Sequence, residues 1–100
     1  MDPAGLPALV EAIRHLHDCE ATWVESASVR ETFQGKVVWE GEVQVFDLAG
    51  HPQATRAFAW SHATQGARRR FVAVLAEGPI NNPVAAVRAA IVAEERAKRN

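Results

Sequence analysis

Apolar residues recur at helical spacing in the first part of the chain. Successive members lie three or four positions apart, which is the stripe of an amphipathic helix. The stripe consists of Leu6, Leu9, Val10, Ile13 and Leu16. Pro7 suits a first helical turn, where its missing N–H is not needed. The pattern predicts a helix over residues 7–18, preceded by a frayed tip at 1–6.

The hydrophobic repeat shortens to two near Thr22, which is the period of a β-strand. Four such runs follow, separated by short segments that contain glycine, proline and polar residues. The runs span 22–33, 37–46, 55–63 and 68–76. In the second run the odd-numbered residues are apolar and the even-numbered residues mostly polar. We therefore expect the odd positions to face the core and the even positions to be mostly exposed.

The first two runs carry local signals. Glu25 and Glu31 interrupt an apolar face that includes Trp23, so this strand is expected to be bent, bulged or at an edge. Gln34-Gly35 suits a tight turn, because Gly35 can supply a positive φ. Gly41 lies in the middle of the second run, where it leaves room for a large neighbour such as a tryptophan.

The periodicity returns to helical spacing after residue 82. Asn82 is the expected N-cap and Pro83 the first helical residue, and the final residues 96–100 are expected to fray. The order of elements predicts an α+β fold: a helix, a four-stranded antiparallel meander and a second helix. We expect both helices to pack on one face of the sheet, within a single domain over 1–100.

Composition excludes several broad classes of protein. The chain is 48% hydrophobic, which argues against intrinsic disorder. It opens without the basic and apolar segments of a signal peptide, and the longest near-apolar stretch is too short to span a membrane. The single cysteine cannot form an internal disulfide. We therefore expect a cytoplasmic protein, and the excess of arginine over lysine suggests a bacterial source.

A sheet covered by helices on one face leaves its other face open. An open apolar face is normally covered by another subunit. The residues expected on it are Phe46, Val38, Val72 and Val74. The first hypothesis is therefore a non-catalytic binding or assembly module that forms a homodimer through its sheet.

A crevice between the sheet and the helices is the second hypothesis, and it would make the protein a small-molecule binder or an enzyme. Trp39, Trp60, His62 and the loop residue His51 are the candidate ligand-binding residues. A histidine beside aromatic rings can act as a general base, while a strand-end histidine can simply donate a hydrogen bond. Catalytic residues stay unassigned, because no nucleophile or carboxylate is placed beside His62 by its spacing.

Arginines suggest a third hypothesis, contact with nucleic acid or an acidic partner. The candidates are Arg56, Arg68, Arg69 and Arg70. The element order resembles that of the double-stranded-RNA-binding domain, a family that carries a lysine cluster at the start of its last helix. The matching stretch, 82–88, contains no lysine, so no binding residue is carried over. Because the net charge is −1, nucleic-acid binding is not expected.

Two further groups of polar residues can be explained without a catalytic or metal-binding role. His15 and Cys19 lie four apart, which suits two metal ligands on a helix, but a full ligand set is missing, so no metal or cofactor is expected. Glu40 and Glu42 project from one face of a strand. Cross-strand pairing with Arg30 or Arg56 would make them an ordinary solvated ladder.

Overall fold

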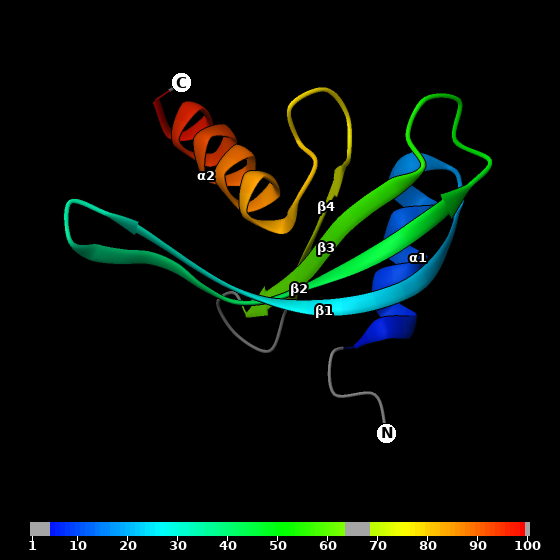
Figure 1. The fold of residues 1–100 in the computed structure, drawn as a ribbon, viewed down its shortest axis with the longest axis horizontal. Coiled ribbons are helices and arrows are strands. Elements are labelled where there is room, and N and C mark those ends of the chain that lie inside the picture. Colours follow the sequence, from blue (N-terminus) through cyan, green and yellow to red (C-terminus); the bar gives the residue numbers. More distant parts are fainter. Residues whose placement is uncertain (1–4, 64–68, 100) are drawn as a thin grey trace.

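The computed structural model describes residues 5–63 and 69–99 and contains two helices and four strands. In chain order they are α1 (Leu6–His17), β1 (Glu20–Phe33), β2 (Lys36–Ala49), β3 (Arg56–Ala63), β4 (Arg69–Leu75) and α2 (Pro83–Arg99). Each strand pairs antiparallel with the next, so the sheet order is β1-β2-β3-β4 (Figure 1). This confirms the predicted α+β class, element order and meander.

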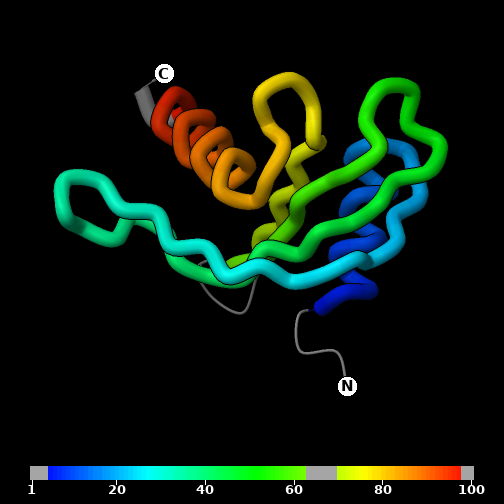
Figure 2. The backbone as a smooth tube through the Cα atoms, in the orientation of Figure 1, coloured from blue at the N-terminus to red at the C-terminus, as the bar shows by residue number. Residues whose placement is uncertain are grey.

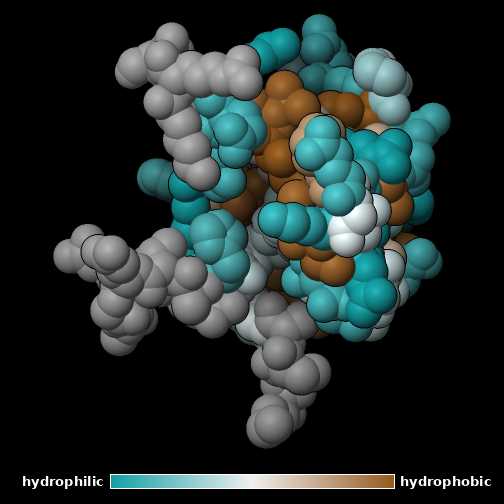
Figure 3. All heavy atoms as spheres, turned by 90° about the vertical axis from the view of Figure 1, so that its left-hand side faces the viewer, coloured by the Kyte–Doolittle hydropathy of each residue, from teal (hydrophilic) through white to brown (hydrophobic). Residues whose placement is uncertain are grey.

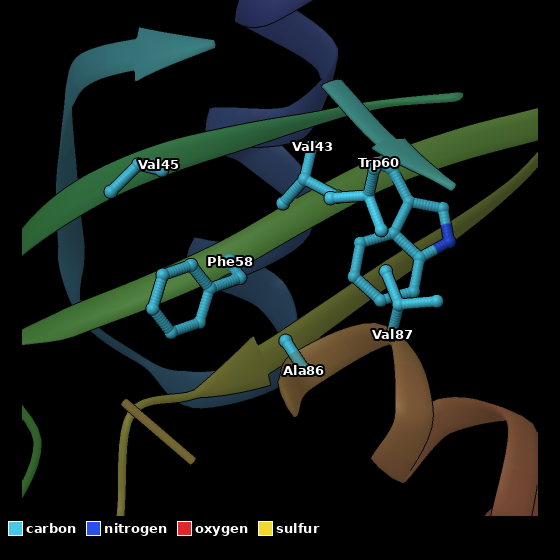
Figure 4. Close-up of a cluster of buried hydrophobic side chains, with 7 residues drawn as sticks. Val43, Val45, Phe58, Trp60, Ala86 and Val87 are labelled. Carbon is cyan, nitrogen blue, oxygen red and sulfur yellow. The ribbon is translucent and has the colours of Figure 1, made fainter. Parts of the chain in front are cut away.

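Both helices contact the sheet, but they lie on opposite faces of it. In β3, Phe58 and Trp60 pack with Val87 of α2, whereas Ala57 and Ala59 pack in the cluster under α1. Figure 4 shows α1 behind the strands and α2 in front of them. The expectation that the helices share one face is therefore wrong. Its physical reason is that β3 and β4 are apolar at both odd and even positions, so each face needs its own cover.

Two hydrophobic clusters result, one on each face. The cluster on the α1 face has the buried residues Leu9, Ile13, Cys19, Phe46, Ala57 and Ala59. The cluster on the α2 face has Val29, Val43, Val45, Phe58, Trp60, Ala86 and Val87. Neighbouring residues of one strand thus belong to different clusters. The expectation that even-numbered residues of β2 are mostly exposed fails at Gln44 and Phe46, which are buried on the face that α1 covers.

The first hairpin extends beyond the rest of the sheet. β2 pairs with β3 only over residues 44–47, whereas its pairing with β1 continues to Lys36 (Figure 2). We call residues 25–43 the arm. Gln34 and Gly35 form its turn with φ values of 52° and 79°, which confirms the predicted tight turn. Figure 3, which views this side, shows apolar side chains among polar ones at the surface. Those exposed near the tip are Phe33, Val37 and Val38.

β1 is an edge strand with two irregularities. Its register against β2 shifts between Trp23 and Glu25 and again between Glu31 and Thr32, which confirms the interruption predicted at the two glutamates. The first shift places Trp23 opposite Phe46, on the α1 face, whereas Val29 lies on the α2 face. The single apolar face suggested by the sequence is therefore divided between the two sides of the sheet.

Local contacts hold α2 against the sheet. Asn82 caps the helix, because its Oδ1 accepts the N–H of Ala85 at 2.8 Å, and Pro83 is the first helical residue as predicted. Arg88 donates to Glu31 of β1 at 2.7 Å. The helix continues to Arg99, past residue 96 where fraying was expected. Within the described residues, neither helix has the length and apolar character needed to cross a membrane.

Candidate functional site

A cavity of about 280 Å³ lies where β2 and β3 part, and we call it the tryptophan cleft. Pairing between these strands ends at Gln44 and Ala59, beyond which the arm leads away from β3 and β4. Helix α2 crosses the resulting gap and packs on both parts. The sheet lines the cleft with Trp39, Trp60, His62 and Val72, and α2 lines it with Val87, Ala90, Ile91 and Glu94.

The two tryptophans form the aromatic wall of the cleft. Their ring centroids are 5.5 Å apart and the ring planes meet at 69°, an edge-to-face contact that is favourable for aromatic pairs. Trp60 is buried and Trp39 half-buried. A Cβ at Gly41 would be 3.2 Å from Cη2 of Trp39. The expectation that Gly41 leaves room for a tryptophan is therefore confirmed.

An ion pair lies beside the cleft and includes one of its lining residues, Glu94. Nη1 of Arg70 on β4 is 3.6 Å from Oε1 of Glu94 on α2, and both side chains are about half exposed. At that distance in water the pair contributes little to stability. Glu94 lines the cleft and Arg70 does not, so the pair places a negative charge in the lining and a positive charge beside it.

A larger groove of about 820 Å³ adjoins the cleft along β4. Val72, Ala90 and Glu94 line both hollows, so the two are adjacent. The groove runs between α2 and β4, which is the second edge strand of the sheet. His17 reaches its rim from α1, with Nε2 3.3 Å from the carbonyl oxygen of Ala73.

Three of the four ligand-binding residues proposed from the sequence line the cleft: Trp39, Trp60 and His62. His51 does not. Its Nδ1 accepts the backbone N–H groups of Gln53 at 3.1 Å and Ala54 at 2.9 Å, so the imidazole closes the loop between β2 and β3.

Sequence reasoning missed the contribution of α2. Ala90, Ile91 and Glu94 read as an ordinary amphipathic stripe with a charged end, and no local pattern shows that such a stripe will bridge two parting strands. Arg70 was singled out for a different role, contact with an acidic partner or nucleic acid. The one available signal was the excess of aromatic residues on the strands that α2 covers.

The proposed dimer face does not exist as one surface. Phe46 is fully buried under α1, whereas Val72 and Val74 pack against the cluster on the α2 face. Val38 is half-exposed on the arm. The four residues were grouped because one face was expected to be open, and α1 covers part of that face.

The structure describes the side chains of two of the four arginines proposed for contact with nucleic acid or an acidic partner. Nη2 of Arg56 donates to Asp47 at 3.1 Å across β2 and β3, and Arg70 faces Glu94. Arg68 lies outside the described residues, as does the side chain of Arg69. The described pair is thus engaged with carboxylates of the chain itself.

The remaining polar groupings have structural roles. Helix α1 ends at His17, so Cys19 has left the helix and the expected four-residue spacing to His15 does not apply. Burial raises the pKa of the Cys19 thiol, with further contributions from Asp18 and Glu20. No group of three metal-binding side chains occurs in the part of the chain that the structure describes. Of the expected cross-strand partners, Arg30 pairs with Glu40 at 2.8 Å, which confirms that part of the ladder. Arg56 pairs with Asp47 instead, and Glu42 accepts from Ser28 at 3.0 Å.

Comparison with protein-family models, with curated proteins and with solved structures finds no match, so no relative indicates a function.

Proposed function

We propose that this protein binds a small organic molecule in the tryptophan cleft. The observation that carries the proposal is the meeting of Trp39, Trp60 and His62 with Glu94 of α2 around a cavity of about 280 Å³. Ligand sites are typically apolar hollows with a few polar groups that orient the ligand. The cleft matches that description, with two indoles, aliphatic walls and one imidazole and one carboxylate at its lining.

The fold explains why a cavity persists here. Side chains normally fill the space between a helix and a sheet to crystal-like density. On the α2 side of the cleft one of the lining residues is Ala90, whose methyl group fills little of the space between the helix and the sheet. Two edge-to-face indoles support the walls without closing the space.

This proposal is favoured over assembly through a sheet face. That hypothesis requires one uncovered apolar face, and the residues proposed for it are divided between the two sides of the sheet, with Phe46 buried under α1. Dimerisation by some other surface stays a prediction, and it is independent of the cleft.

A fragment screen by ligand-observed NMR tests the proposal. We expect small aromatic or aliphatic fragments to bind the wild-type protein and to lose binding in Ala90→Leu, which adds bulk at a position that lines both the cleft and the groove. Ala8→Leu is the matched control, because Ala8 is exposed on α1 on the other side of the sheet. The milder Ala90→Val serves if the leucine disturbs folding. Absence of binding, or binding that Ala90→Leu leaves unchanged, would contradict the proposal.

A further inference from the structure

The indole N–H of Trp60 has no hydrogen-bond acceptor among the residues that the structure describes. Trp60 is only 4% exposed, and among the described residues no group accepts a hydrogen bond from its Nε1. The contrast with Trp23 is direct, because the Nε1 of Trp23 donates to Gln44 at 2.9 Å. Buried tryptophan N–H groups usually find a partner, and a donor left without one is unfavourable.

The position of this donor connects it with the cleft. Trp60 is one of the lining residues, and Figure 4 shows its nitrogen on the side of the ring that faces away from Phe58. The packed interior around Phe58 is therefore on one side of the indole and the polar atom on the other. An acceptor on a molecule in the cleft would satisfy the N–H.

We propose that the natural ligand is an uncharged aromatic molecule that carries a hydrogen-bond acceptor, such as a ring nitrogen or a carbonyl oxygen. This rests on the proposed function. The aromatic body follows from the two indoles, because aromatic pairs gain more than their buried area alone provides. The absence of net charge follows from Glu94 and Arg70, which balance each other beside the cavity at 3.6 Å.

The charge balance also separates this ligand from two alternatives. An anionic acceptor would approach the Glu94 carboxylate, which lines the cleft, and an organic cation would offer no acceptor to Trp60. A neutral acceptor satisfies the buried donor and avoids the repulsion from Glu94. The cavity volume of about 280 Å³ limits the ligand to a small one, near the lower end of ordinary ligand sites.

Quinoline and naphthalene test the inference, because they have the same shape and differ in one ring nitrogen. We expect the wild-type protein to bind quinoline, which is uncharged near neutral pH, roughly 3- to 10-fold more tightly than naphthalene, the gain typical of one neutral hydrogen bond. Trp60→Phe keeps an aromatic ring and removes the N–H, so it should bind both probes equally. Trp23→Phe is the matched control and should keep the preference, since Trp23 lies on the other face.

The other possible results distinguish failure of this inference from failure of the proposed function. Equal binding of both probes to the wild-type protein would overturn the inference and leave the proposed function standing, because the Trp60 N–H would then be satisfied by water. A preference that survives Trp60→Phe would also overturn it, because the acceptor would be recognised elsewhere. Failure of both probes to bind would overturn the inference, and failure of the whole fragment set as well would overturn the proposed function.

Discussion

Trp39 lies against the α-carbon of Gly41, so closely that a Cβ built on Gly41 would be 3.2 Å from Cη2 of the indole. The two residues are two positions apart on β2 and thus share a face of the strand. Gly41 has an ordinary strand conformation, so its lack of a side chain serves this contact and not a positive φ. The absence of a side chain at Gly41 therefore allows the Trp39 ring to take its position in the lining of the tryptophan cleft.

Gly41→Ala tests that relationship. An alanine in a strand interior is ordinarily favoured over glycine by about 0.5–1 kcal/mol. Here the added methyl group displaces the Trp39 ring, and overpacking of this kind costs about 1–3 kcal/mol. We therefore expect a net loss of about 1 kcal/mol in the free energy of unfolding, measured by urea denaturation.

The same substitution in a Trp39→Phe background is the control. Phenylalanine lacks the ring atom that the new methyl group would meet, so Gly41→Ala should then be neutral or stabilising. A loss of equal size in both backgrounds would show that the indole contact is not the cause.

Gln34→Asn should stabilise the turn of the arm. Gln34 and Gly35 both have positive φ, the arrangement of a type I′ turn, in which asparagine followed by glycine is preferred. A left-handed conformation costs a residue such as glutamine roughly 1 kcal/mol, and asparagine tolerates it better. We expect the free energy of unfolding to rise by up to about 1 kcal/mol. Gln53→Asn, at an exposed loop position without positive φ, should change nothing; an equal gain there would refute the explanation.

Asn82→Ala should weaken the start of α2. The substitution removes the acceptor for the Ala85 N–H and leaves that group to water. Loss of an N-cap costs about 1 kcal/mol, which chemical denaturation resolves. Asn82→Asp retains an acceptor oxygen and should stay within a few tenths of a kcal/mol of the wild-type protein. If the two variants proved equally destabilised, the cap would not be the reason.

Stability should fall in acid through Glu20. Arg14 holds its carboxylate with two bonds, Nε to Oε2 at 2.9 Å and Nη2 to Oε1 at 2.7 Å, and these lower the pKa of Glu20 below its ordinary 4.5. A lowered pKa means that the contribution is present above the unfolded value of 4.5 and is lost as the pH falls through the folded value.

Glu20→Gln makes this visible as a difference in pH dependence. The variant should lose less of its unfolding midpoint than the wild-type protein when the pH is lowered from neutral to below about 4. The effect will be small, because the pair is solvent-exposed. Glu77→Gln is a suitable control, since Glu77 is exposed and belongs to no described ion pair. Parallel pH curves for wild type and Glu20→Gln would contradict the assignment.

Local pattern determined the elements but not how they cover the sheet. The switch from a repeat of three or four to a repeat of two located both helices and all four strands, and Asn82-Pro83 marked the start of α2 correctly. These features depend on neighbours in sequence. Val45 and Phe46 show the limit: both are apolar, and nothing in the chain says which helix covers which one.

For the same reason, the sequence predicted only the residues that the strands contribute to the candidate site, and not those of α2. Trp39, Trp60 and His62 stood out as aromatic residues and a histidine on strands. That Glu94 and Ala90 would join them depends on where the β2–β3 pairing ends, which is a tertiary feature. The register shift after Trp23 likewise moved one tryptophan to the opposite face; Glu25 indicated an irregularity there, but not which face Trp23 would take.

The indole resonances of the three tryptophans test the central claim most directly. In ¹H–¹⁵N spectra, assigned with single Trp→Phe variants, quinoline added to the wild-type protein should shift the N–H signals of Trp39 and Trp60. The signal of Trp23 should stay, because that residue lies on the α1 face and bonds Gln44. If none of the three signals moves, or that of Trp23 moves alone, the tryptophan cleft is not where the probe binds.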